Sequence, residues 1–419
     1  MSQSAWPVRA DRISASRVPL DTIVALVVVA LMPLRIRTMF EIPLAVVVCA
    51  VLLPVTLRHL SRYIGAWAIV SLTLAAALSG WALTVLSGAV RDVSNALLIA
   101  QSARVLGIGV LLAALLWARS LAGTRQVILA FGVGTLVNVA LSGVNGANPW
   151  KFSFSIPITL VLLSLPLVYG RKLPQFLVVV ALAGVSAVSD SRSAAGFLLI
   201  AAAITLTQSR GAAGTSIALR RWLTLVRVVV LALAAFVLLQ AAILEGMLGE
   251  GIQERTQAQI DRSGSVFAGG RPELGASVAL LRAEPGGYGS GAVLSGTDVR
   301  VAKQGMWSLG YDPNNGYVEN YMFGDGIELH SLFADIWVMF GVGGIALALA
   351  IIVFTMRGVL HDIATGVAST VAMYLALRLL WDMAFSPWLS SLVLLPLAVG
   401  ASLTDRVVAR QQQETAGRR

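Results

Sequence analysis

The chain has 419 residues, of which 57% are hydrophobic and 12% are charged, whereas soluble domains average roughly 45–50% and about 25%. With a mean hydropathy of +0.81, this composition indicates a polytopic membrane protein, and the net charge of +10 is expected to reflect membrane topology. Nucleic acid is excluded as a partner because no long basic run interleaved with aromatic residues occurs, and the single cysteine, Cys49, excludes an intrachain disulfide and a cysteine metal cluster.

The N-terminal segment is polar and basic through Arg17 and then becomes apolar. It lacks a small-residue cleavage site, so the first apolar stretch is predicted to be a retained span and not a removed signal peptide. The spans are predicted to be helices because the apolar runs are continuous and not alternating. About twelve stretches are long enough to cross, or nearly cross, a bilayer: 18–34, 40–57, 66–87, 96–118, 126–144, 153–170, 174–190, 193–208, 223–245, 332–355, 367–383 and 388–403.

The positions of arginine and lysine predict the orientation of these spans. With the N-terminus inside, the inner segments carry seventeen of these residues, and the short outer loops carry five: Arg35, Arg37, Arg91, Lys151 and Arg192. The positive-inside rule then places both termini in the cytoplasm. The even number of spans agrees with this topology.

One long polar segment, about 246–329, falls on the outer side. It contains ten acidic and six basic residues, a net charge of −4, and many turn residues, which favours a folded cap over an anion-binding surface. Within it, 271–281 is predicted to be a short amphipathic helix, with Pro272 in its first turn and Pro285-Gly286-Gly287 ending it.

The fold is therefore expected to be all-α, a polytopic transmembrane helical bundle with one large extracytoplasmic loop domain. The predicted domains are an N-terminal bundle of about nine spans over residues 1–245, the loop with short helices over 246–331, and C-terminal spans with a cytoplasmic tail over 332–419.

Ionisable side chains inside the predicted spans are costly, so each requires a reason. Arg104 lies in the fourth span on the same helical face as Gln101, and a structural and a functional role are both open for it. Arg378 is followed at i+4 by Asp382, and these two residues are expected to form an internal ion pair.

Arg192 lies in a tight outer turn, Ser189 to Ala195, against the positive-inside trend. Two interpretations remain open for this residue. It either anchors the turn at the interface, with its charge balanced by Asp190, or holds an anion, because a guanidinium can bind two phosphate oxygens at once.

His330 is one of three histidines, and it lies where the polar loop meets an apolar helix, whereas His59 and His361 lie in short basic segments. Imidazole is the side chain best suited to take up a proton near neutral pH. One interpretation is an interfacial histidine that anchors the helix end. The other is a general base working beside Arg192 and Arg271 on the same face, where arginines would neutralise a departing diphosphate and the histidine would take a proton from an attacking hydroxyl.

Several short motifs occur in a fixed order over residues 185–350. They are Ser191-Arg192-Ser193-Ala194, Gly270-Arg271, Pro285-Gly286-Gly287-Tyr288-Gly289-Ser290-Gly291, and His330-Ser331 leading into Phe340-Gly341-Val342-Gly343-Gly344. In this order and spacing the chain resembles the O-antigen ligase/polymerase family. The first 180 residues resemble that family only in being multi-spanning.

The resemblance implies a metal-independent, cofactor-free glycosyltransferase of the integral-membrane C type in the bacterial cytoplasmic membrane. Its active site would face the extracytoplasmic side, its donor would be an undecaprenyl-diphosphate-linked glycan, and its acceptor would be a sugar hydroxyl on a glycan or lipid-glycan. The resemblance maps diphosphate binding onto Arg192 and Arg271 and catalysis onto His330. Arg271 is expected to be catalytic together with His330, and Arg104 is a further candidate for binding the donor diphosphate. Polymerase is slightly favoured over ligase, but the Asp/Asn/Tyr-rich insert at 296–327 leaves the acceptor open.

Two rival functions are weighed against this one. A metal-dependent transferase that uses a polyprenyl monophosphate sugar would want acidic ligands in the first outer loop, where none precedes Glu41. A secondary transporter or lipid-linked-glycan flippase would show inverted repeats and a charged midplane cavity. No repeat is visible in the sequence, and the candidate residues gather at one face.

Overall fold

The computed structural model describes residues 19–36, 38, 42–208, 250–263, 271–324 and 326–410, together with single positions between 219 and 245. In this part of the chain the regular elements are all helices, accompanied by two isolated β-bridges, Tyr63 with Asp405 and Val93 with Ala292. The prediction of an all-α protein is confirmed for these residues.

Four helices in the described residues are long and apolar enough to cross a membrane: α4 (Ala66–Ser87), α5 (Asn95–Ala122), α6 (Thr124–Ser142) and α15 (Leu332–Thr365). A fifth is added if α2 (Leu44–Val51) is counted together with the helical run Leu53–Arg62, from which it is bent by 60°. That run comprises α3 (Leu53–Thr56) and η1 (Leu57–Arg62). The chain is thus a helical membrane protein by length and composition of its helices.

The remaining predicted spans correspond to shorter or broken helices. These are α1 (Leu20–Leu31), η2 (Trp150–Phe154) with α7 (Ser155–Ser164), α8 (Lys172–Val188), α9 (Arg192–Thr207), α16 (Thr370–Phe385), α17 (Trp388–Ser391) and α18 (Leu395–Ser402). Proline contributes to two of the boundaries, because Pro43 precedes α2 and Pro387 precedes α17. The predicted span at 223–245 lies outside the continuously described residues.

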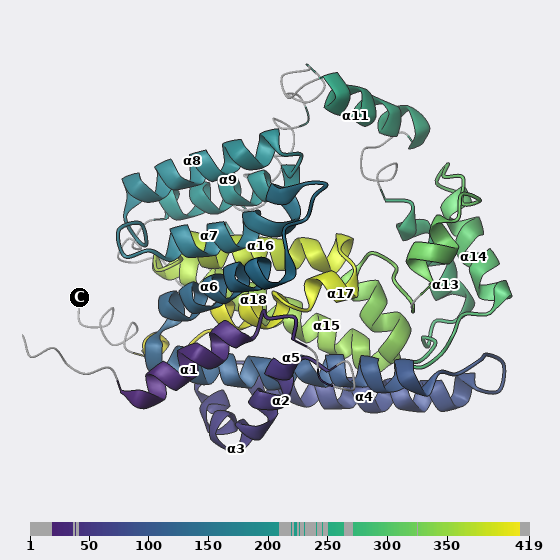
Figure 1. The fold of residues 1–419 in the computed structure, drawn as a ribbon, viewed down its shortest axis with the longest axis horizontal. Coiled ribbons are helices and arrows are strands. Elements are labelled where there is room, and N and C mark those ends of the chain that lie inside the picture. The colour runs from purple at the N-terminus through teal and green to yellow at the C-terminus, as the bar shows by residue number, and fades with distance from the viewer. Residues whose placement is uncertain are drawn as a thin grey trace, which may run out of the picture.

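The core is built on α15, α4 and α5, which pack against one another in that order. In Figure 1, α4 and α5 lie in the lower part of the molecule, and α16 packs against α15 above them, with α7 and α9 packed in turn against α16. The 34 residues of α15 are interrupted at Gly341, whose φ of 54° and ψ of −135° are not helical. Arg378 and Asp382, on α16, form the predicted ion pair, with Nε and Oδ2 3.6 Å apart.

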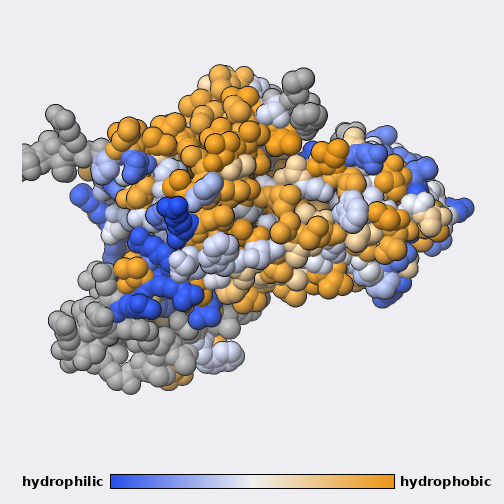
Figure 2. Space-filling model, turned by 90° about the horizontal axis from the view of Figure 1, so that it is seen from below, coloured by the Kyte–Doolittle hydropathy of each residue, from blue (hydrophilic) through white to orange (hydrophobic). Residues whose placement is uncertain are grey.

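The outer surface of the helical body is apolar. Along α4, one face exposes Leu74, Leu78, Trp81 and Val85, each at 54–62%, with the i, i+4, i+7 spacing of a single helix face. Figure 2 shows the molecule from the side of α4, with apolar surface across its middle and hydrophilic residues gathered towards its two ends. An exposed apolar band between polar ends is what a bilayer covers.

The polar segment after α9 contains α11 (Glu250–Ser263), α13 (Glu273–Ala283), α14 (Gly296–Trp307) and η3 (Val318–Met322). The predicted short helix is confirmed as α13, with Pro272 as its N-cap. It packs closely on α14 because Gly275 faces the backbone of Gly305. Figure 1 places α13 and α14 together at one end of the helical body.

The glycine-rich stretch Pro285 to Gly291 attaches this segment to the core. The backbone N–H of Tyr288 donates to the carbonyl of Val338 at 2.7 Å, and that of Gly291 donates to Thr84 Oγ1 at 2.9 Å. Gly289 has a φ of +109°, and a Cβ there would lie 2.6 Å from the backbone nitrogen of Thr84. The glycines are therefore required by close backbone packing on α4 and α15.

A buried ion pair provides a second attachment. Arg91, in the turn between α4 and α5, donates to Asp298 through Nε at 2.9 Å and through a terminal nitrogen at 3.0 Å. Asp298 also completes a capping box with Ser295 at the start of α14. Burial alone would raise the pKa of Asp298, but the hydrogen bonds from Arg91 and Ser295 outweigh it and lower the pKa below the ordinary carboxylate value.

Candidate active site

The loop before α15 is fixed by a carboxylate in the first turn of that helix. Asp335 is fully buried; its Oδ1 accepts a hydrogen bond from the backbone N–H of Leu329, and its Oδ2 accepts one from the backbone N–H of Trp388 at 2.8 Å. Ser331 caps α15 and donates its hydroxyl to the carbonyl of Met383 at 2.9 Å. The residue between Leu329 and Ser331 is thereby held against the region where α16 ends.

That residue is His330, which has a φ of 55°, a left-handed conformation that is uncommon outside glycine. Its Nε2 lies 3.5 Å from the hydroxyl oxygen of Tyr317. Its Nδ1 is buried and makes no hydrogen bond to any described residue. A buried ring nitrogen of this kind calls for an explanation, and a catalytic role is one of the few available.

Tyr317 stands at the centre of a cluster that also contains Glu273, Tyr321 and His330. Its hydroxyl donates to Glu273 Oε1 at 2.6 Å, and its ring stacks on Tyr321 with centroids 5.8 Å apart. Burial, together with the hydrogen bond to Glu273, raises the pKa of Tyr317 above its ordinary value. The hydroxyl is therefore protonated at neutral pH.

Arg271 packs against Phe385 and is near enough to Tyr317 for its charge to act on the hydroxyl. Its guanidinium sits 5.8 Å from the ring centroid of Phe385, the last residue of α16, in a favourable cation–π position. Its positive charge also acts on Tyr317, where it opposes the increase in pKa. The structure thus gathers Arg271 and His330, two of the predicted site residues, around Tyr317.

Arg192 is the first residue of α9, and packing links this helix to the cluster. Its Nε lies 3.3 Å from Asp190 Oδ1, the partner that the anchoring interpretation expects. On the same helix, Phe197 packs edge-on against Trp381 at 5.7 Å, and Trp381 packs on Phe385 at 4.5 Å. An aromatic row therefore connects the helix of Arg192 with the ring beneath Arg271.

Arg104 lies on α5, one turn after Gln101. Gln101 is buried, and its Oε1 accepts a hydrogen bond from the indole N–H of Trp388 at 2.9 Å. Because the backbone N–H of Trp388 binds Asp335, α5 is connected with the loop that carries His330. This connection passes through Gln101, and it does not by itself place Arg104 against the cluster.

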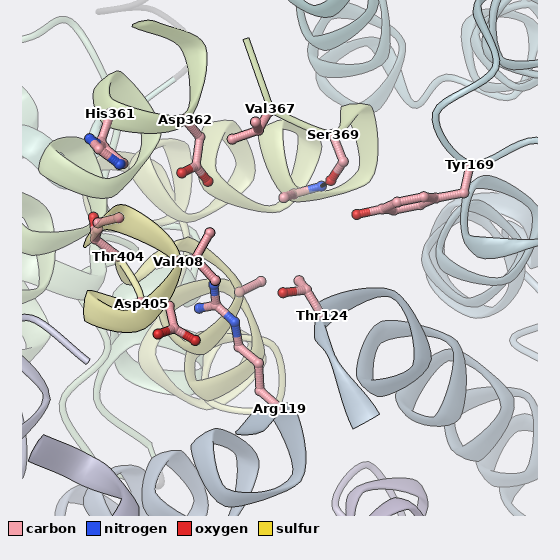
Figure 3. A pocket seen from close by; sticks show the side chains of 13 residues that line it. Arg119, Thr124, Tyr169, His361, Asp362, Val367, Ser369, Thr404, Asp405 and Val408 are labelled. Atoms are coloured by element: carbon pink, nitrogen blue, oxygen red, sulfur yellow. Dashed lines mark hydrogen bonds between the residues drawn. The ribbon is translucent and has the colours of Figure 1, made fainter. Parts of the chain in front are cut away.

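A second polar site lies at the opposite end of α15. It is a cavity of about 170 Å³ in which Arg119, Asp362 and Asp405 point towards one another, with His361 nearby (Figure 3). Arg119 donates to the carbonyls of Gly400 and Leu403, and Asp405 is paired with Arg62 at 2.7 Å. Arg119 and Asp405 therefore already have partners within the fold.

The sequence analysis did not identify three residues that build or support the site around Tyr317. Glu273 follows Pro272 directly, Tyr317 lies in the turn-rich insert, and Asp335 is an acidic residue inside an apolar span. Asp335 carried a usable signal, because a carboxylate in a span needs a partner. The pairing of Glu273 with Tyr317 joins residues 44 positions apart, and the sequence holds no pattern that predicts it.

No protein-family model, curated protein or solved structure matches this chain. Within the described ranges, no group of three or more His, Cys, Asp and Glu side chains is arranged to hold a metal ion.

Proposed function

We propose that this protein is a membrane glycosyltransferase that moves glycan from undecaprenyl diphosphate to a sugar hydroxyl outside the cytoplasmic membrane. The observation that carries the proposal is the gathering of Arg271 and His330 around Tyr317, at the end of the apolar helical body where α13 and α14 lie. The order of short motifs over 185–350, which resembles the O-antigen ligase/polymerase family, supports it.

The proposed step is a substitution at the anomeric carbon of the donor sugar. The acceptor hydroxyl oxygen forms the new bond to that carbon, while the bond from the carbon to the diphosphate oxygen breaks. His330 takes the proton of the hydroxyl, and the diphosphate leaves as an anion. Arg271 stabilises the leaving diphosphate through its planar fork of N–H donors, with Arg192 and Arg104 as further donor-binding residues.

The proposed topology is a bundle of about twelve spans with both termini in the cytoplasm and the segment 246–331 outside. Its support is the distribution of basic residues and the apolar surface between two hydrophilic ends (Figure 2). In this arrangement the cluster at His330 faces the extracytoplasmic side, where glycans linked to undecaprenyl diphosphate are used. Elongation of a polysaccharide is slightly favoured over ligation to a lipid-glycan.

The test is a transfer assay with purified protein and an undecaprenyl-diphosphate oligosaccharide, with and without added lipid-glycan acceptor. Longer glycans without added acceptor indicate a polymerase, and acceptor-dependent products indicate a ligase. His361→Ala is the matched control for His330→Ala, because His361 lies near the C-terminal end of α15, whereas His330 directly precedes the N-cap of that helix. Absence of transfer by the wild-type protein with every donor and acceptor tested would contradict the proposal.

A transporter or flippase is the second candidate, and two features of the fold favour it. The break in α15 at Gly341 and the 60° bend after α2 resemble the discontinuous helices of transporters. At Gly341, however, the break is filled by the glycine-rich loop, since the backbone of Gly287 faces that of Gly341. Movement of labelled donor lipid across a vesicle membrane without any new glycosidic bond would favour this candidate.

A further inference from the structure

The hydrogen bonds of Tyr317 restrict the chemistry of His330. A tyrosine hydroxyl has one hydrogen to donate. At 2.6 Å from Glu273 Oε1, that hydrogen points at the carboxylate, because an ionised carboxylate can only accept. The side of the hydroxyl oxygen that faces His330 therefore carries a lone pair.

We propose that Glu273 and Tyr317 are positioning residues that hold His330 in the tautomer with hydrogen on Nε2. The nitrogen 3.5 Å from the Tyr317 oxygen must then be the donor, and Nδ1 carries the lone pair. This makes Nδ1 the atom that takes the proton of the acceptor hydroxyl. The assignment to a reaction rests on the proposed function, whereas the assignment of the tautomer does not.

Burial limits competition from water for the hydrogen bond between Tyr317 and Glu273. Glu273 is 7% exposed, and its second oxygen, Oε2, is buried with no hydrogen-bond partner among the described residues. The raised pKa of Tyr317 keeps its single hydrogen in place. The carboxylate therefore acts on the histidine through the tyrosine, as the second hydrogen-bond partner of a catalytic imidazole commonly fixes its tautomer.

The buried Nδ1 of His330 supports the second part of the proposal, that this nitrogen takes up the proton of the acceptor hydroxyl. It is buried, and no described residue donates to it, although a lone pair in such a position is stabilised by a donor. An alcohol is a suitable donor, and its deprotonation is the step that the proposed reaction needs. The left-handed backbone of His330 is held on either side through Leu329 and Ser331, which fixes the position from which its ring extends.

The test is nitrogen NMR of the full-length protein in lipid nanodiscs with ¹⁵N-labelled histidine and no substrate. The chain has three histidines, so the signals of His330 are assigned as those missing from a His330→Gln sample. We expect the wild-type protein to show a protonated Nε2 and an unprotonated Nδ1. A protonated Nδ1 with a bare Nε2 would overturn the proposal.

Two variants test the role of the pair. Tyr317→Phe removes the hydroxyl, so we expect a mixture of tautomers and a decrease in kcat of about 10- to 100-fold, less than the roughly 10²–10⁴-fold that loss of the base itself would cause. Glu273→Leu removes the acceptor of the Tyr317 hydroxyl, so the hydroxyl can turn its hydrogen towards Nε2 of His330, which favours hydrogen on Nδ1. An unchanged tautomer in both variants would refute the proposal.

Tyr321→Phe is the matched control. Tyr321 stacks on Tyr317 and is 72% exposed, so the variant keeps the aromatic packing and is expected to leave the tautomer and kcat unchanged. A folded protein with the expected tautomer but no transfer would contradict the proposed function alone. Transfer by a protein with hydrogen on Nδ1 would contradict the positioning role alone.

Discussion

Replacing Asp335 with asparagine should disturb the candidate site while changing the size of one side chain hardly at all. Both carboxylate oxygens of Asp335 accept hydrogen bonds from backbone N–H groups, one from Leu329 and one from Trp388. An asparagine side chain has one oxygen and one NH₂ group. In Asp335→Asn, one of the two N–H groups must therefore face another donor.

The expected loss of stability in Asp335→Asn follows from the burial of this side chain. Asp335 has no exposed surface, so no water replaces the lost acceptor, and a buried unsatisfied donor costs about 1–3 kcal/mol. Relaxation of the loop at Leu329 would relieve part of that cost by moving His330. A displacement of about 1 Å at a reacting group can lower the rate by about 10²-fold.

The loss of stability and the loss of transfer rate can be measured on the same preparation. We expect Asp335→Asn to have a lower melting temperature in detergent and a lower kcat in the transfer assay. Asp362→Asn is the control, because Asp362 lies near the other end of the same helix and lines the distant cavity. If Asp335→Asn kept the wild-type melting temperature and kcat, the positioning of His330 through the first turn of α15 would be refuted.

Three further predictions test other parts of the account. Arg271→Lys should leave the protein folded but reduce transfer strongly, because lysine keeps the charge and loses the planar fork; near-normal turnover would show that Arg271 acts as a point charge or a structural residue. Asp298→Asn should lower the melting temperature at neutral pH, where the ion pair with Arg91 contributes. Because the pKa of Asp298 is lowered in the folded protein, this difference should shrink as the pH falls below about 4, the unfolded value, and a constant difference would refute the pairing. Gly289→Ala should destabilise the protein by about 2 kcal/mol or more, because φ is +109° and the new Cβ would lie 2.6 Å from the backbone of α4. Gly286→Ala, which has open space around its Cβ position, should be close to neutral in the same thermal unfolding measurement.

Helix positions could be predicted wherever residues within the segment itself determine where the helix begins and ends. The apolar runs at 66–87 and 96–118 correspond to α4 and α5, and Pro272 with Pro285-Gly286-Gly287 bounds α13. The break at Gly341 could not be predicted, because it depends on the approach of a loop more than fifty residues earlier in the chain. The predicted span at 40–57 was based on apolar composition alone, and this composition does not indicate the bend after α2.

The candidate site was predictable only in part, because some of its contacts join segments that are distant in the sequence. Arg271 and His330 stood out through charge placement and rarity, and each is near the cluster centre. Tyr317 did not stand out, since its role arises from a hydrogen bond to Glu273 and a contact with His330 that exist only after folding. Arg192 was open to two interpretations, and its contact with Asp190 satisfies the anchoring one without deciding the other.

The most direct measurement compares donor binding and glycan transfer for His330→Gln. Glutamine keeps hydrogen bonding and approximate size but cannot take up a proton near neutral pH. The account predicts a folded protein that binds the undecaprenyl-diphosphate donor with nearly wild-type affinity, since the arginines hold the diphosphate, and transfers about 10²–10⁴-fold more slowly. Wild-type turnover by the folded glutamine variant would contradict the assignment of His330 as the base.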